Sequence, residues 1–334
     1  MSRHAATLLL TPGDPGGLGP ELVIRLFSQE SQLVPGRVVL VGHMEALRLH
    51  QKDMGLQGDI FSPLDSLDGI AGLPPGVYGF TPQDIADLPA TPGEASRDGG
   101  RAAGVSLQVA LEQLNQGKAH GLVTGPLNKA KLMEAGYDFP GHTEFLAEGA
   151  GLKRDEVCMH LCGPSLRVSL VTTHLPISRV PAEITRERIL RCLGLTCRFL
   201  EELGVDGPVA VAGLNPHAGE EGRLGREEIE IIQPAVEQAL RDGLQAVGPL
   251  PGDTVFHRAA RGEFGAVLAM FHDQGLAPLK SLHFSDAVNV TLGLPFVRTS
   301  VDHGAGYDLV GTGRASISSL RSAVTLASQL VSAV

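Results

Sequence analysis

Three histidines occupy the same position relative to three apolar runs. His174 ends the stretch "VSLVTTH", His217 follows "VAVAGLNP", and His272 follows "AVLAMF". Ligands of open α/β sheets bind beyond the carboxyl ends of the strands, so we expect these side chains to converge on one point. Each histidine alone would more often be structural. Together, three neutral imidazoles are a typical ligand set for Zn²⁺ or a similar divalent ion, with coordination positions left for water or substrate.

Groups suited to binding an anion follow the third histidine. Lys280 comes shortly after it, and "DAVNVTLGLPFVRTSVDHG" contains Asn289 and Arg298. Arginine holds a carboxylate or phosphate through two parallel hydrogen bonds, whereas lysine acts as a point charge. The alternative for each residue is a surface salt bridge or a hydrogen-bonded cap.

Four further polar residues have more than one interpretation. His142 and Thr143 in "GHTEFLAEGAG" could contact a ligand, or Thr143 could cap the helix that follows. Asp253 in "GPLPGDTVF" is either a turn residue or a carboxylate near the metal. Asp273, directly after the third histidine, could orient an imidazole, move a proton or cap the turn "DQGLAP".

The elements that must position these residues alternate between strands and helices. Strands are predicted at "ATLLLT", "RVVLVG", "GLVTG", "LRVSLVTTH", "PVAVAGLNPH" and "GAVLAMFHD", and helices at "GRAAGVSLQVALEQLNQG", "TRERILRCLGLTCRFLEEL" and "REEIEIIQPAVEQALRDG". This order indicates an α/β fold with a largely parallel sheet. The 334 residues predict two domains, with a switch near residues 125–141, and residues 73–92 form a long connection or an edge hairpin.

Composition excludes several classes of function. The net charge of -10 argues against nucleic acid as a partner, because binding a polyanion needs a basic surface. The first apolar run is too short for a membrane span or a signal sequence, so we expect a soluble, cytoplasmic protein. The spacing of Cys158, Cys162, Cys192 and Cys197 does not match the usual zinc pairs, which favours reduced thiols.

The stretch "LLLTPGDPGGLGPELVI" is similar to a nucleotide-binding turn between a strand and a helix. However, Leu22 stands where the dinucleotide fingerprint requires glycine, and the chain has no phosphate-binding Gly-Lys-Ser/Thr motif. A standard Rossmann site is therefore not predicted. The alternative is a tight turn before a helix that Pro20 opens, with Glu21 in its first turn.

The motifs, taken in order, resemble one family over nearly the whole chain. They are "TPGDPGGLGPELV", "TGPLNK", "GHTEFLAE", "TTHLP", "GLNPHAGEEGRLGREE", "GPLPGDTVF", "MFHDQGLAPLK" and "VNVTLGLPFVRTSVDHG". The chain resembles the 4-hydroxythreonine-4-phosphate dehydrogenase family of the pyridoxal phosphate pathway. The resemblance implies a homodimer with an isocitrate/isopropylmalate dehydrogenase-like fold, two α/β domains and a cleft between them. Residues 1–130 with 300–334 would form the first domain, and residues 131–299 the second, with the metal ligands and dimer contacts.

The resemblance also implies roles for individual residues. The metal ligands fall on His174, His217 and His272, and the substrate contacts on His142, Thr143, Lys280, Asn289 and Arg298. Candidate catalytic groups are His142, Asp253 and Asp273, and no cofactor-binding residue is assigned. In this family the active site lies at the dimer interface, so the three histidines need not belong to one chain.

The implied reaction uses NAD or NADP and a divalent metal, namely zinc, magnesium or cobalt. It oxidises 4-phosphooxy-L-threonine to a 3-keto acid, which loses carbon dioxide to give 3-amino-2-oxopropyl phosphate. The metal would lower the pKa of the substrate hydroxyl and stabilise the charge that develops as carbon dioxide leaves. Lys280 and Arg298 would hold the anionic ends of this small phosphorylated substrate.

One departure and two rival functions remain. The family commonly reads Asp-His-Gly-Thr-Ala where this chain has "DHGAG", with Ala305 and Gly306, which leaves the cofactor contacts and coenzyme preference open. A sister group with the same motifs oxidises D-threonate or D-erythronate 4-phosphate. A metal-dependent phosphohydrolase would also use three histidines, an aspartate and basic residues. A metal-binding protein without catalytic activity would not need the groups that bind an anion.

Overall fold

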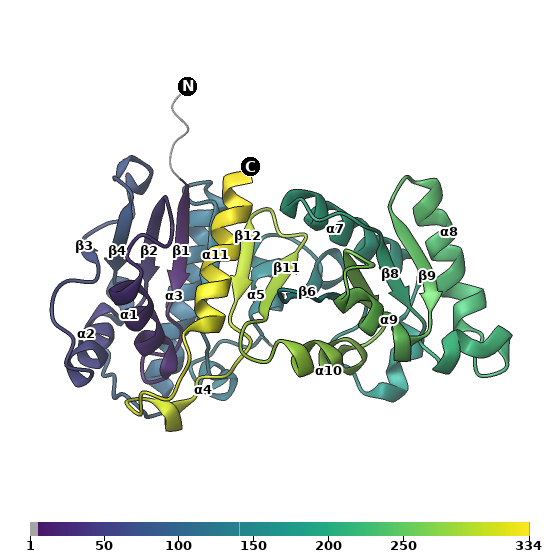
Figure 1. The fold of residues 1–334 in the computed structure, drawn as a ribbon. Helices are drawn as coiled ribbons and strands as arrows, with labels where there is room; N and C mark the ends of the chain where they lie inside the picture. The colour runs from purple at the N-terminus through teal and green to yellow at the C-terminus, as the bar shows by residue number, and fades with distance from the viewer. Residues whose placement is uncertain (1–5, 140, 334) are drawn as a thin grey trace. The chain divides into compact units, whose positions relative to one another are not determined.

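The computed structural model describes residues 6–139 and 141–333, which form two compact units. The first unit contains the described residues up to Gly151 and those from Leu294 onward, and the second is Leu152–Gly293. The sequence placed the boundaries at residues 130 and 300. In the structure the first boundary lies later, after Gly151, and the second lies earlier, before Leu294. Strands and helices alternate in both units (Figure 1), so the predicted α/β fold class is confirmed.

The sheet of the first unit runs in the order β3-β4-β2-β1-β5-β12 and is parallel throughout. Its strands are β1 (Thr7–Thr11), β2 (Arg37–Val41), β3 (Ser62–Leu64), β4 (Gly76–Phe80), β5 (Gly121–Thr124) and β12 (Val297–Ser300). Every residue of β1, β2 and β5 is buried, as expected for parallel strands covered on both faces. Residues 73–92 contain β4, which pairs in parallel with β2, so the hairpin interpretation was wrong.

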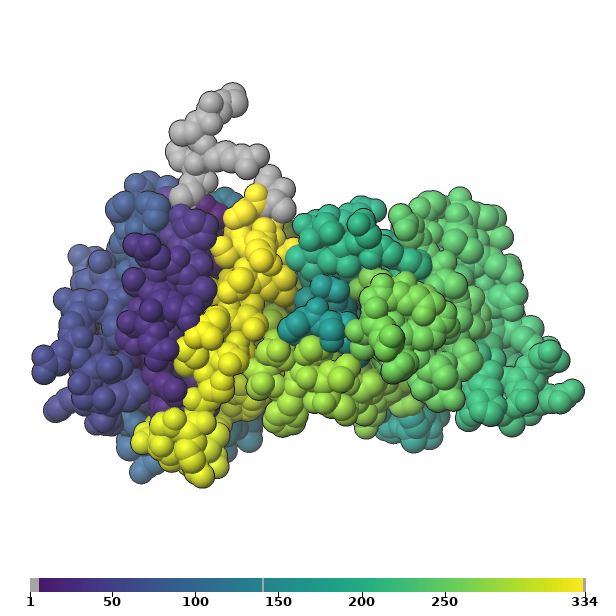
Figure 2. Space-filling view, in the orientation of Figure 1, coloured from purple at the N-terminus to yellow at the C-terminus, as the bar shows by residue number. Residues whose placement is uncertain are grey.

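Six α-helices accompany this sheet in the described part of the first unit. They are α1 (Leu18–Gln29), α2 (Met44–Asp53), α3 (Arg97–Asn115), α4 (Lys129–Glu134), α5 (His142–Gly149) and α11 (Ser318–Ala333), with 3₁₀ turns at Ile70–Gly72, Gln83–Ile85 and Tyr307–Leu309. Helix α1 begins two residues before Pro20. Figure 2 shows α11, in yellow, along the surface beside the purple N-terminal segment, and α11 contacts α1.

The sheet of the second unit runs in the order β11-β6-β7-β10-β8-β9. Its strands are β6 (Cys158–Cys162), β7 (Arg167–Leu170), β8 (Val209–Ala212), β9 (Ala246–Leu250), β10 (Ala266–Ala269) and β11 (Val288–Leu292). The four strands from β7 to β9 are parallel, whereas β6 pairs antiparallel with both β7 and β11. This mixed sheet leaves β7, β10 and β8 as adjacent parallel strands, and these are the strands that precede the three histidines.

The helices of the second unit are α6 (Val180–Glu183), α7 (Arg186–Leu203), α8 (Gln233–Arg241), α9 (Gly252–Ala260) and α10 (His272–Leu282). Shorter helical segments are the 3₁₀ turns Arg154–Glu156, Ile177–Arg179 and Pro216–Gly222 and the π-helix Glu228–Ile232. Thr185 caps α7 by accepting a hydrogen bond from the Arg188 N–H, and the left-handed Gly204 ends it. Among the described residues, no helix has the length and apolarity needed to cross a bilayer.

Candidate functional site

Two of the predicted metal ligands lie side by side in the second unit. Strands β7 and β10 pair in parallel with Leu170 opposite Ala269, so the chain leaves both strands at one edge of the sheet. The Thr172 hydroxyl donates to the Met270 carbonyl at 2.7 Å and extends this pairing. The ring centroids of His174 and His272, which follow, are 5.4 Å apart. The sheet therefore brings together two imidazoles from separate segments.

His272 is the first residue of α10, so the predicted turn "DQGLAP" is wrong, because these residues are helical. Gly275 and Pro278 suggested a turn because both disfavour helix interiors. Packing overrides this preference: a Cβ atom at Gly275 would lie 2.6 Å from Val168, so only glycine lets the helix approach the sheet this closely. Leu276 and Leu279 are buried in the same core.

A carboxylate faces one nitrogen of the His272 ring. Asp273 Oδ1 lies 2.8 Å from His272 Nδ1, and the Asp273 side chain is 89% exposed. Metal-binding histidines commonly use one ring nitrogen for such a partner and keep the other for the metal. Of the three roles considered for Asp273, this contact favours orientation of the imidazole.

His217 lies on a strained backbone segment that follows β8. Residues 217–221 all have positive φ, between 42° and 81°, and four of the five are not glycine. Left-handed backbone costs L-residues roughly 1–2 kcal/mol each. His217 Nδ1 lies 3.2 Å from Glu220 Oε2, which repeats the imidazole–carboxylate pairing of His272. We call this segment, Pro216–Gly222, the left-handed turn.

The three histidines do not form one cluster within a chain. Across residues 6–139 and 141–333, no group of three or more His, Cys, Asp or Glu side chains is arranged to hold a metal ion. The convergence on one point expected from a single sheet is therefore absent from this part of the chain. The four cysteines are free thiols.

The other predicted residues of the second unit are spread over three elements. Lys280 is in the last turn of α10, about 12 Å along the helix axis from His272. Asn289, on β11 opposite Leu161, has a buried Oδ1 atom with no hydrogen-bond partner among the described residues. A buried acceptor without a donor costs about 1–3 kcal/mol, which an incoming donor would recover. Asp253 is exposed in the first turn of α9.

In the first unit, Arg298 lies on β12 and is buried, with 2% of its surface exposed. It donates a hydrogen bond of 2.8 Å to the hydroxyl of Thr124, the last residue of the neighbouring strand β5. Burial lowers the pKa of Arg298 to about 10, although the charge of Glu144 opposes the shift. The guanidinium remains charged at neutral pH, and a buried cation near strand ends is suited to binding an anion.

Helix α5 begins at His142 and is capped by Gly141, so Thr143 lies within the first turn and the proposal that Thr143 caps the helix was wrong. Burial lowers the pKa of His142 well below its usual value, and the charges of Arg298 and Lys129 add to the effect. The His142 imidazole is therefore neutral at physiological pH. The neutral ring has a lone pair that can accept a hydrogen bond, but its lowered pKa makes it a weak base, so proton transfer by His142 stays a prediction.

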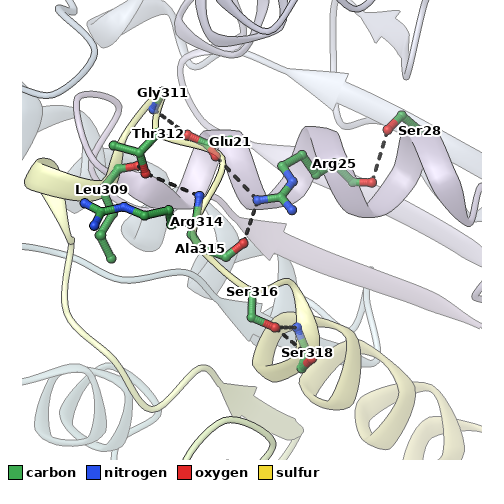
Figure 3. Close-up of polar contacts among 10 residues, drawn as sticks. All are labelled: Glu21, Arg25, Ser28, Leu309, Gly311, Thr312, Arg314, Ala315, Ser316 and Ser318. Carbon is green, nitrogen blue, oxygen red and sulfur yellow. Dashed lines mark hydrogen bonds and ion pairs between the residues drawn. The ribbon is translucent and has the colours of Figure 1, made fainter.

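Sequence reasoning missed a polar connection between α1 and the C-terminal loop, drawn in Figure 3. Glu21, which is 1% exposed, accepts a hydrogen bond of 2.8 Å from the Gly311 N–H and pairs with Arg25 at 3.5 Å. Arg25 also donates to the Ala315 carbonyl at 2.6 Å. The first-turn position of Glu21 suggested only an interaction with the helix dipole, whereas its carboxylate fixes a loop more than 280 residues away in sequence.

The two residues that depart from the family pattern lie in the same loop. The Ala305 carbonyl accepts a hydrogen bond of 2.7 Å from the Leu18 N–H. A Cβ atom at Gly17 would lie 3.0 Å from this carbonyl oxygen. The glycine-rich turn is thus packed against the chain's own loop. Gly306 has a φ of 55°, in the left-handed region that favours glycine.

Asp14 and Tyr307 form a second connection that sequence reasoning missed. The Tyr307 hydroxyl donates a hydrogen bond of 2.7 Å to Asp14 Oδ2, and the Gly16 N–H donates to Asp14 Oδ1 at 2.9 Å. Burial raises the pKa of Asp14 despite these two donors, and it also raises the pKa of Tyr307. Asp14 and Tyr307 are 293 residues apart in sequence, so no local motif could have indicated that they form a pair.

Parallel strands followed by imidazoles, and a buried guanidinium that reaches the hydroxyl at the end of β5, define an α/β protein with polar groups near the strand ends, where ligands of this class bind. Residues 38–327 match the family described as pyridoxal phosphate biosynthetic protein PdxA. The chain therefore belongs to the PdxA family.

Relatives cover almost all of the chain. A Geobacter metallireducens protein named 4-hydroxythreonine-4-phosphate dehydrogenase is 42% identical over 99% of this chain and 97% of its own. A Bradyrhizobium diazoefficiens protein, whose name assigns it provisionally as a D-threonate 4-phosphate dehydrogenase, is 39% identical over 98% of this chain and 97% of its own.

Solved structures support the fold. That of 4-hydroxythreonine-4-phosphate dehydrogenase from Klebsiella pneumoniae has a TM-score of 0.84 and 35% identity, covering 98% of this chain and all of that one. Terephthalate 1,2-cis-dihydrodiol dehydrogenase from Burkholderia xenovorans has a TM-score of 0.68 and 27% identity, covering 97% and 98%. The same fold thus occurs with differently named substrates.

Proposed function

We propose that the protein is an NAD(P)- and divalent-metal-dependent 4-hydroxythreonine-4-phosphate dehydrogenase of pyridoxal phosphate biosynthesis. It oxidises 4-phosphooxy-L-threonine to a 3-keto acid, which decarboxylates to 3-amino-2-oxopropyl phosphate. Family membership, with a match over residues 38–327 and relatives that cover almost all of the chain, supports the reaction. The observation that carries the assignment to an anionic substrate is the buried Arg298 guanidinium, hydrogen-bonded to Thr124 beside the neutral His142.

Arg298 and Lys280 hold the anionic ends of the substrate. A buried guanidinium binds a carboxylate or phosphate strongly, because little water competes for its donors. His142, kept neutral by its surroundings, accepts the proton of the substrate hydroxyl, and Thr143 follows it at the start of α5. Asn289 Oδ1 accepts a hydrogen bond from the ammonium or hydroxyl group of the substrate, which gives this buried oxygen a donor.

The residues fit a divalent metal with nitrogen ligands, such as Zn²⁺ or Co²⁺. His174 and His272 are adjacent, and His217 and His272 each have a carboxylate on Nδ1. A homodimer in which a partner copy contributes the third imidazole completes the set. When bound, the metal lowers the pKa of the substrate hydroxyl and stabilises negative charge during decarboxylation. Asp273 orients His272, and Asp253 remains a further candidate for proton transfer.

A bound nicotinamide cofactor would accept the hydride. The glycine-rich turn before α1 departs from the dinucleotide fingerprint at Leu22, and its glycines pack against the chain itself. A Cβ atom at Gly19 would lie 1.8 Å from the Pro12 carbonyl oxygen, so this glycine is needed for packing of the chain on itself. No residue of the chain is assigned to the cofactor, and kinetic assays with NAD⁺ and NADP⁺ decide the coenzyme preference.

Purified protein with Zn²⁺, Co²⁺ or Mg²⁺ should reduce NAD⁺ or NADP⁺, followed at 340 nm, when 4-phosphooxy-L-threonine is added. Equimolar carbon dioxide should be released. The Bradyrhizobium relative favours one rival, so D-threonate and D-erythronate 4-phosphate are compared in the same assay. A higher kcat/KM for either amine-free acid would replace the proposed substrate. Phosphate release without nicotinamide reduction would indicate a phosphohydrolase and overturn the proposal.

A further inference from the structure

The left-handed turn needs support from outside itself. Five consecutive residues with positive φ form its backbone, and most of them carry a Cβ atom that disfavours this conformation. Strained segments of this kind persist only where surrounding contacts determine the backbone. The question is which residue holds His217, the residue that begins the left-handed stretch.

Glu228 holds the residue that leads into the turn. Its carboxylate accepts the Asn215 backbone N–H on Oε1 at 2.7 Å and the Asn215 side-chain amide on Oε2 at 2.9 Å. Asn215 directly precedes the turn, so one carboxylate fixes both its backbone and its side chain. Glu228 is 2% exposed, which strengthens hydrogen bonds to its charge. Glu227 contributes one bond to the same amide, at 2.7 Å.

Three glycines show how closely the backbone surrounds this carboxylate. A Cβ atom at Gly219 would lie 2.6 Å from Glu228 Oε2, and one at Gly213 would lie 3.1 Å from Glu228 Oε1. A Cβ atom at Gly225 would lie 2.1 Å from Asn215 Nδ2. The buried carboxylate and the turn therefore fit together without space for a methyl group.

Glu228 also opens a short π-helix, Glu228–Ile232, in front of α8. A π-helical segment is uncommon and often marks a functional site. Ile232, at its other end, is fully buried, so this segment is anchored in the core while Glu228 faces the turn.

We propose that Glu228 is a positioning residue, whose buried carboxylate holds the left-handed turn in the conformation that presents His217 to the metal. We call the two hydrogen bonds from Asn215 to the Glu228 carboxylate the latch. The consequence for metal binding rests on the proposed function, in which His217 is a ligand. Glu228 touches neither substrate nor metal in this role and acts through Asn215 and the backbone of the turn.

The latch is tested in metal-free protein with Glu228→Gln. Glutamine keeps the size of the side chain but turns an amide donor towards the Asn215 amide, so one of two hydrogen bonds is lost. The matched control is Glu230→Gln, two residues along the same π-helix, where the exposed side chain pairs only with Arg226 among the contacts found. Amide hydrogen exchange of residues 215–225 should be about 10-fold faster in Glu228→Gln and unchanged in the control. Equal exchange in both variants would overturn the latch.

Presentation of His217 is tested with Zn²⁺ alone, by calorimetric titration of the full-length metal-free protein. Loss of supporting contacts around a metal ligand typically weakens binding 10–100-fold, so we expect about 10-fold weaker binding for Glu228→Gln. Glu230→Gln should bind as the wild type does. Faster exchange combined with wild-type affinity would reduce Glu228 to a structural role and overturn the positioning claim.

A pair of glycine variants tests the fit without changing a charge. Gly219 and Gly222 both have positive φ, at 81° and 87°, so Gly219→Ala and Gly222→Ala carry similar backbone strain. Only Gly219→Ala places a methyl group against Glu228, since a Cβ atom at Gly222 meets the flexible end of Ile229 at 3.1 Å. Gly219→Ala should weaken Zn²⁺ binding at least 5-fold more than Gly222→Ala. Equal losses would contradict the fit.

His217→Ala separates this inference from the proposed function. If His217→Ala binds Zn²⁺ as tightly as the wild type, then the ligand assignment fails, and with it the positioning claim, whatever Glu228→Gln does to hydrogen exchange. If His217→Ala loses binding while Glu228→Gln does not, then the ligand assignment stands and only the positioning claim fails.

Discussion

The polar groups at the strand ends of the two units are held in different ways. In the first unit, Arg298 is 2% exposed and bonded to Thr124, and burial controls the protonation of His142. In the second unit, the side chains of His217 and His272 are 65% and 31% exposed and rely on adjacent carboxylates and backbone geometry. Charge state is therefore fixed by burial in the first unit, whereas position is fixed by the backbone in the second. Substitutions should cost stability in the first unit and mainly activity in the second.

The largest effect is expected for His272→Ala. Loss of a metal ligand should lower kcat/KM at least about 10³-fold and reduce bound metal, because the Lewis acid contributes several kcal/mol to catalysis. The midpoint of thermal unfolding should stay near the wild-type value, since the side chain is partly exposed. Activity and metal content are measured on the same sample. A metal-free variant that retains activity would refute the ligand assignment, and a large loss of stability would break the contrast between the units.

A buried histidine in the second unit tests whether burial alone sets protonation. His160 is fully buried, its Nδ1 lies 2.8 Å from the Ser169 hydroxyl, and burial, with a smaller effect of Arg167, lowers its pKa to about 3. The unfolded chain binds this proton near pH 6.5. Stability from the neutral ring is therefore complete above pH 6.5 and is lost as the pH falls towards 3.

The loss should reach about 3 kcal/mol by pH 4, measured as the free energy of unfolding in urea at several pH values. His160→Gln, which cannot titrate, should depend less steeply on pH between 6.5 and 4. Parallel pH profiles for the wild type and the variant would show that His160 titrates alike in the folded and the unfolded protein, and that burial does not lower its pKa.

Arg298→Lys exchanges a fork of donors for a point charge at a buried position. We expect KM for the phosphorylated substrate to rise about 10-fold with a smaller change in kcat, because the lost contacts act on binding. The free energy of unfolding should fall by about 1–2 kcal/mol, as Thr124 loses its partner. Steady-state kinetics and urea unfolding provide both values. Lys280→Arg is the comparison. Lys280 is half-buried in the last turn of α10, so this change should leave the free energy of unfolding unchanged. An unchanged KM for Arg298→Lys would argue against its role in substrate binding.

The smallest effect is expected for Tyr307→Phe, which removes only the hydroxyl that donates to Asp14. The free energy of unfolding should fall by about 1 kcal/mol, the usual value of one hydrogen bond. Removing this donor should also raise the pKa of Asp14 further, since the bond favours the carboxylate. Urea unfolding at pH 7 measures the change. A Tyr307→Phe protein as stable as the wild type would show that the hydrogen bond between Tyr307 and Asp14 does not contribute to the free energy of unfolding.

The sequence predicted the central part of the fold because those strands are buried at every position. The runs that became β1, β2, β5 and β10 are continuous apolar segments between turns, and such runs are recognisable without tertiary information. Strand β3 has only three residues, largely exposed, and β11 contains the polar Asn289 and Thr291, so neither carried that signal. The α10 helix was hidden by Gly275 and Pro278.

Residue types at the candidate site were predictable, whereas their geometry was not. The position of His174 and His272 after apolar strands follows from the α/β order of the chain, but the adjacency of β7 and β10 does not, because β8 and β9 lie between them in sequence. The left-handed conformation at His217 does not, because four of its five residues lack the usual glycine signal. The contribution of Glu228 depends on a contact between segments that only the folded chain brings together.

The division of the chain at Gly151 and Leu294 determines the order in which the protein can fold during synthesis. The second unit is one continuous segment, so the ribosome delivers all of it before β12 and α11 exist. The first unit must wait, because β12 pairs with β5 and α11 packs on both strands. Until the last forty or so residues emerge, one edge of β5 lies open to other chains. Truncation of α11 leaves β12 able to pair with β5 but uncovers both strands where α11 packs on them. It should therefore cause aggregation of nascent protein even though every proposed site residue has already been synthesised.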